Sequence, residues 1–181
     1  MFFNFSQTKA AGKKFLLAAM VLVLLTSVFV GCKTETEDNF TTSTTVPAKL
    51  VGKWGSSFND YHEIKKSGDD YTYEYYMPES EYEGITYPAS SIFGIIRSVT
   101  YNSNTGIIIY ELTTGNNEIG DIGKFSASYY KELTNTKFRA STVYSATLPM
   151  MFDTLPEAKA AFTVDATGDY IGWWGGPFTK E

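Results

Sequence analysis

The chain has 181 residues, with 20 acidic and 15 basic side chains and a formal net charge of −5 at pH 7. A net acidic chain is a poor partner for nucleic acid, because binding to phosphates requires a basic patch. With one histidine and one cysteine, the chain also lacks the ligand set of a zinc site and offers little for a Ser-His-Asp or Cys-His catalytic centre.

Residues 1–31 have the pattern of a secretory signal peptide. Lys9, Lys13 and Lys14 form a basic start, and the uncharged apolar run 15–30 follows them. As a helix, at about 1.5 Å per residue, this run would span about 24 Å, less than the roughly 30 Å hydrocarbon core of a bilayer. Because the run lengthens when it is counted on to the cysteine, a permanent transmembrane anchor is the alternative to cleavage.

Val30, Gly31 and Cys32 resemble the lipobox of bacterial lipoproteins, with Phe29 where that pattern usually has leucine. The resemblance implies cleavage before Cys32, a diacylglycerol on its sulfur and a further acyl chain, such as palmitate, on its amino group. Several acyl chains anchor a protein stably, at about 0.8 kcal/mol per buried CH₂. The resemblance therefore implies a lipid-anchored envelope protein, and Lys33 after the cysteine favours the outer membrane over the inner one.

The segment 32–45 is rich in threonine and charge, and only Phe40 in it is large and apolar. Such a segment buries too little surface to offset the entropy lost on ordering, so a flexible tether is predicted. Val46 and Pro47 mark its end.

Residues 46–181 are predicted to form one all-β domain. Alternating or β-branched stretches bounded by turn residues predict strands, and they lie at 48–57, 60–66, 71–77, 91–101, 106–114, 124–132, 137–145 and 168–180. In the stretch 71–77, Tyr71, Tyr73 and Tyr75 should share one face. About eight short strands predict a small antiparallel up-and-down β-barrel, with a β-sandwich as the alternative.

One short helix is expected near the C-terminus, at 154–162. Thr154 and Glu157 have the spacing of a capping box, and Pro156 lies in the first turn. Leu155, Ala158 and Phe162 recur at helical spacing and should pack on the sheet.

Gly52, Lys53 and Trp54 resemble the G-x-W motif that opens the first strand of lipocalins and their calycin relatives. The resemblance covers residues 46–145 and implies a barrel whose closed end is plugged by Trp54. It also implies a basic side chain from a late strand stacked on that tryptophan, for which Arg139 is the candidate. The C-terminal sequence GWWGGP departs from the family.

The sequence does not favour an enzyme, and no metal or cofactor is expected. His62 lies in a strand stretch, DYHEIKK, where a solvated histidine is expected. Acidic pairs such as Asp69 and Asp70 could in principle serve glycoside hydrolysis. They lie in turn-like, polar sequence, where solvated charge is the usual state.

Two classes of function remain open. In the first, the barrel binds a small apolar or amphipathic ligand. All 13 tyrosines follow residue 50, and tyrosine suits a pocket lining, so the lining is predicted to include Tyr73, Tyr75, Arg97 and Tyr129. In the second, a filled barrel is a scaffold for contact with another protein or a host molecule. An enclosed cavity bordered by tyrosine would favour the first class, and an exposed aromatic patch the second.

Overall fold

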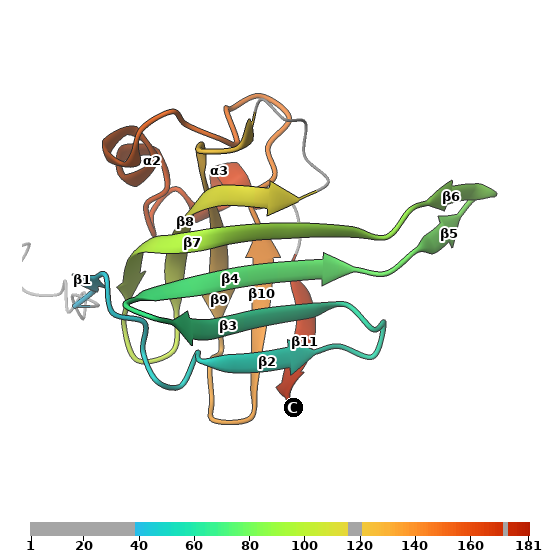
Figure 1. Ribbon diagram of the computed structural model, residues 1–181, viewed down its shortest axis with the longest axis horizontal. Helices are drawn as coiled ribbons and strands as arrows, with labels where there is room; N and C mark the ends of the chain where they lie inside the picture. Colours follow the sequence, from blue (N-terminus) through green and yellow to red (C-terminus); the bar gives the residue numbers. More distant parts are fainter. Residues whose placement is uncertain (1–38, 116–120, 172–173) are drawn as a thin grey trace, which may run out of the picture. The chain divides into compact units, whose positions relative to one another are not determined.

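The computed structural model describes residues 39–115, 121–171 and 174–181. Within these residues, eight strands form a closed antiparallel barrel in which neighbours along the chain are neighbours in the sheet (Figure 1). They are β2 (Gly52–Gly55), β3 (Tyr61–Ser67), β4 (Asp70–Met77), β7 (Ser90–Tyr101), β8 (Gly106–Gly115), β9 (Phe125–Lys131), β10 (Lys137–Thr142) and β11 (Gly175–Lys180). The predicted all-β barrel is confirmed, and the sandwich is excluded because β7 pairs with β8 and β2 with β11.

Alternation along the strands decides which side chains fill the barrel. Across β3 and β4, His62 pairs with Tyr75 and Ile64 with Tyr73. All four side chains are buried, whereas Glu74, between the two tyrosines, is only partly buried. The face predicted for Tyr73 and Tyr75 is therefore the interior face of the barrel.

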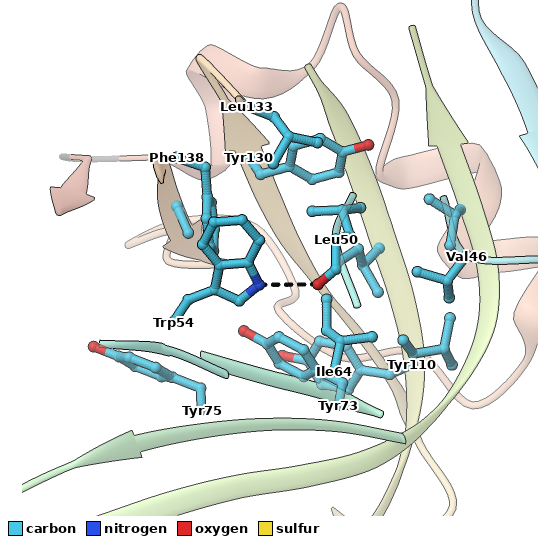
Figure 2. Packing of buried hydrophobic residues seen from close by; sticks show 14 of the residues in the cluster. Val46, Leu50, Trp54, Ile64, Tyr73, Tyr75, Tyr110, Tyr130, Leu133 and Phe138 are labelled. Atoms are coloured by element: carbon cyan, nitrogen blue, oxygen red, sulfur yellow. Dashed lines mark hydrogen bonds between the residues drawn. The ribbon is translucent and has the colours of Figure 1, made fainter. Parts of the chain in front are cut away.

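One end of the barrel, called the closed end here, is filled by apolar side chains (Figure 2). It is the end at which β2 begins and β9 and β11 finish. Val46 and Leu50, from the segment before β2, enter it together with Leu133 from the β9–β10 turn, and all three are buried. Trp54 is fully buried beside them, and its indole Nε1 donates a hydrogen bond of 2.9 Å to the Leu50 carbonyl.

A second core lies on the outer face of β8 and β9, beneath the segment that joins β10 to β11. This segment contains α2 (Leu155–Ala161) and α3 (Thr167–Tyr170). The buried members of the second core come from both strands and both helical turns: Ile107, Ile109, Ala127, Tyr129, Ala158, Phe162 and Tyr170.

The predicted helix is confirmed in α2, and so is the half of the predicted capping box in which the Thr154 side chain caps the first turn. Thr154 is the N-cap, and its Oγ1 accepts a hydrogen bond of 3.4 Å from the Glu157 backbone N–H and donates one of 2.8 Å to the Glu157 carboxylate. The helix α3 was not predicted; it is a single turn whose N-cap residue, Ala166, forms no side-chain hydrogen bond.

Part of the predicted tether is ordered. Thr41–Ser43 form β1, which pairs with Val99–Tyr101 at the end of β7. This correction has a simple cause: β4 pairs only with the first half of β7, so the edge of its second half is open for another strand.

A small hairpin between β4 and β7 was also not predicted. Its strands β5 (Ser80–Tyr82) and β6 (Ile85–Tyr87) pair only with each other and extend beyond the barrel wall (Figure 1). Every residue of the two strands is exposed.

Candidate functional site

The end of the barrel opposite the closed end is hollow, and it is called the open end here. An inner hollow of about 190 Å³ is lined by His62, Tyr75, Gly175, Phe178 and residues 140–144. An outer hollow of about 400 Å³ is lined by Tyr75 and Gly175 again, together with Ser56, Phe58, Asp60, residues 77–80, Trp174 and Gly176. Because the hollows share Tyr75 and Gly175, they adjoin each other.

His62 lies at the floor of the inner hollow, with only 2% of its surface exposed. Its imidazole stacks on Tyr75, at 4.4 Å between ring centroids and 16° between ring planes, and meets Phe178 edge-on at 4.4 Å. Burial lowers the pKa of His62 to about 3, so the ring is neutral at physiological pH.

The expectation of a solvated His62 is therefore wrong. His62 pairs with Trp54 of β2 and lies two residues before the buried Ile64 on β3. Both relations place its side chain on the interior face, where period-two alternation requires it. That alternation was the signal in the sequence that could have revealed the site.

A hydrogen bond with Tyr73 fixes the orientation of the His62 imidazole. The Tyr73 hydroxyl oxygen lies 2.8 Å from His62 Nδ1. Burial raises the pKa of Tyr73 well above its usual value of 10, so the phenol keeps its proton. Burial also raises the pKa of Tyr75 to about 12, helped by the neighbouring Asp60 carboxylate.

The stacking partner predicted for Trp54 is wrong. The cation over its indole ring is Lys180, whose Nζ lies 4.9 Å from the ring centroid. Arg139 points to the outside and donates a hydrogen bond of 3.2 Å to the Trp174 carbonyl. The cause is strand alternation: the adjacent Phe138 points inward and packs edge-on against Trp54, with 4.9 Å between the centroids.

The four residues predicted to line a ligand site do not lie together. Tyr73 and Tyr75 face the barrel interior, and Tyr75 lines both hollows. Tyr129 belongs to the second core on the outer face, where its hydroxyl donates to the Thr163 carbonyl at 3.4 Å. Arg97 also lies outside the interior core.

Arg97 is held by two carboxylates on the barrel surface. Its Nε lies 2.8 Å from Glu111 Oε2, and its Nη1 lies 3.3 Å from Asp70 Oδ1. A register shift between Ile96 and Ser98 places Arg97 at an irregularity of β7, and such a bulge interrupts simple alternation.

The charged side chains that line the two hollows are acidic. Asp60 and Glu79 line the outer hollow, and among the described residues neither hollow is lined by lysine or arginine. Within the same part of the chain, no three His, Cys, Asp or Glu side chains are grouped to hold a metal ion.

The anchor predicted at Cys32 lies outside the described residues. In the part of the chain that the structure covers, no helix has the length and apolar character needed to cross a membrane.

The geometry defines the class of fold: a closed, eight-stranded, antiparallel up-and-down barrel, compatible with a lipocalin-like fold. No protein-family model matches the chain, and no match is found among the curated proteins or the solved structures. A role must therefore be argued from the site itself.

Proposed function

We propose that this chain is an envelope lipoprotein, anchored in the membrane through Cys32, whose barrel binds a small apolar or amphipathic ligand. The observation that carries the ligand-binding part is the pair of adjoining hollows at the open end, because His62 and Tyr75, whose side chains face the barrel interior, line the inner one. The closed end also has a hollow, of about 610 Å³, lined by residues 45–48, Val51, Lys66, Tyr71 and Tyr101, but Trp54 and Leu50 fill the barrel interior there. A concave, mainly apolar site with a few polar groups is the usual form of a small-molecule site.

The anchor is supported by the basic start, the apolar run and the lipobox-like Val30–Gly31–Cys32. Metabolic labelling with a fatty-acid analogue should label the wild-type protein, and Cys32→Ser should abolish the label because it removes the acylated sulfur. Cys32→Ser should also leave an unprocessed, longer chain. Equal labelling of the two proteins would contradict the anchor.

Ligand binding is expected to stabilise the barrel and to change the emission of Trp174, which lines the outer hollow. A panel of single-ring aromatics, fatty acids and retinoids would be added to the full chain in lipid nanodiscs, with empty nanodiscs as blanks. A ligand at ten times its Kd adds about 1.4 kcal/mol to the free energy of unfolding. For a chain of this size that is a rise of a few degrees in Tm.

A blocking variant tests whether binding occurs inside the barrel. Ala140 lines the inner hollow and is buried, so Ala140→Leu should fill part of the space and abolish binding. Thr179→Leu, on the exposed face of the neighbouring β11, is the matched control and should bind normally. Binding that survives Ala140→Leu would place the ligand elsewhere.

The second candidate is the scaffold for contact with a protein or host molecule. The observation that favours it is the β5–β6 hairpin, where Tyr82, Ile85 and Tyr87 are 66%, 56% and 48% exposed. Exposed apolar groups gathered on one projection are typical of a contact surface. If no member of the ligand panel raises the Tm or changes Trp emission, this second candidate becomes the better account of the chain.

A further inference from the structure

His62, at the floor of the inner hollow, indicates which class of ligand the hollow binds. We infer that this hollow takes a neutral, single-ring aromatic molecule carrying one hydrogen-bond acceptor, which receives the Nε2 hydrogen of His62. This inference rests on the ligand-binding function proposed above, and it adds the class of ligand and the residue that selects it.

The first step is the position of the imidazole hydrogen. His62 Nδ1 and the Tyr73 hydroxyl are 2.8 Å apart and share one hydrogen bond. A phenol is the stronger donor of the two groups, and an imidazole nitrogen is the stronger acceptor. The Tyr73 hydroxyl therefore donates to Nδ1, and the hydrogen of the neutral ring is carried by Nε2.

The second step is that Nε2 faces the hollow. No described residue forms a hydrogen bond with Nε2, and Nε2 is not among the fully buried polar atoms that lack a partner. The small surface that His62 does expose therefore includes this nitrogen, and the inner hollow is the space that His62 lines. A buried donor open only to a hollow is completed by a ligand or water acceptor.

The size and shape of the inner hollow suit a single aromatic ring. The inner hollow, about 190 Å³, compares with the roughly 150 Å³ engineered cavity that binds benzene. Besides His62, its lining contains three aromatic residues, Tyr75, Tyr144 and Phe178. Flat aromatic walls around a space of this size suit one planar ring better than a flexible acyl chain.

The charged residues that line the hollows disfavour a negatively charged ligand. A carboxylate placed here would be taken out of water without a cation, since neither hollow is lined by lysine or arginine among the described residues. It would also meet Asp60 and Glu79 on its way through the outer hollow. Burying an unpaired charge is costly, so the site should reject anions of the right shape.

The test compares benzamide, benzoate and toluene on the full chain in lipid nanodiscs. Benzamide has a neutral acceptor on the ring, benzoate has the same shape with a negative charge, and toluene has no acceptor. His62 is the only histidine in the chain, so ¹⁵N-histidine labelling gives one imidazole in solid-state NMR. The free protein should show a protonated Nε2 and an unprotonated Nδ1. Benzamide should shift the Nε2 resonance, and its affinity should exceed that of benzoate and toluene by about tenfold or more, the effect of one well-placed hydrogen bond.

Two variants separate recognition from folding. His62→Phe keeps an aromatic ring and removes the donor, so benzamide affinity should fall about tenfold while toluene affinity should not fall. Tyr73→Phe removes the group that fixes the imidazole hydrogen, so the ¹⁵N spectrum should show exchange between the two neutral forms. Because Tyr73→Phe retains His62, it tests the inference even if His62→Phe does not fold.

The outcomes distinguish this inference from the proposed function. If toluene and benzoate bind as tightly as benzamide, or if Nδ1 carries the hydrogen, the ligand class is wrong while ligand binding stands. If neither these compounds nor the wider panel bind, the proposed function fails together with the inference.

Discussion

Replacing Trp54 by alanine is expected to lower the free energy of unfolding by about 3–5 kcal/mol, the range for truncating a large buried aromatic residue. Trp54 is fully buried at the closed end and packs edge-on against Phe138. The substitution also leaves the Leu50 carbonyl without the indole N–H that donates to it at 2.9 Å. Denaturant unfolding followed by circular dichroism measures the loss, without relying on tryptophan emission.

A matched control is Trp174→Ala. Trp174 is only partly buried, so its truncation should cost clearly less than that of Trp54. Equal losses for the two substitutions would contradict a special role for Trp54 in closing the barrel.

Double-mutant cycles with Trp54→Ala test whether Lys180 or Arg139 is the cation over the indole ring. Lys180→Ala should cost about 0.5–2 kcal/mol, the range for a cation–π contact. Its loss should not add to that of Trp54→Ala, because the two side chains touch. Arg139→Ala and Trp54→Ala should add, since Arg139 points away from Trp54. Additivity for Lys180 and coupling for Arg139 would reverse the assignment.

Gly52 makes the Lys180 contact possible. Its φ of +138° lies in the region that favours glycine, and a Cβ there would lie 2.7 Å from Lys180 Cε. The glycine of the G-x-W pattern therefore has a local physical reason, which is that a side chain would displace the lysine that lies over the tryptophan.

The fold was largely predictable because alternation is a local property of each strand. The strands at 91–101 and 106–114, the shared face of Tyr73 and Tyr75 and the capped start of α2 all follow from neighbours in the sequence. The strands β1, β5 and β6 were missed because each has only three residues. A strand of that length is too short for a periodic pattern to be recognised.

The candidate site was less predictable because it depends on which strands meet. Lys180 and Trp54 lie at opposite ends of the domain sequence, and only the pairing of β11 with β2 brings them together. Tyr129 lies beneath the helical segment and Arg97 at a bulge. Neither the packing of that segment nor the bulge is visible in a strand pattern. His62 could have been assigned inward from the spacing to Ile64, and its polarity alone suggested solvent.

The buried imidazole of His62 should make the stability of the protein depend on pH. In the unfolded chain a histidine has a pKa of about 6.5, whereas burial lowers the pKa of folded His62 to about 3. Between these values the unfolded state binds a proton that the folded state does not. The free energy of unfolding should therefore fall as the pH is lowered from about 6.5 toward 3, by up to about 1.4 kcal/mol per pH unit. Above pH 6.5 the contribution of His62 is complete and constant.

The difference in pH dependence between the wild type and His62→Phe gives the contribution of His62, because the carboxylates are the same in both proteins. Tyr73 and Tyr75, which contact the imidazole, stay neutral throughout because burial raises the pKa of each. Urea unfolding at constant ionic strength from pH 7.5 to 4 should therefore give a steeper decline for the wild type, with the two curves approaching each other or crossing in acid. Parallel curves would show that the His62 ring is protonated as readily in the barrel as in the unfolded chain. Water would then have to reach His62 at the floor of the inner hollow freely. The proposal that a neutral His62 imidazole donates a hydrogen bond to the ligand would also fail.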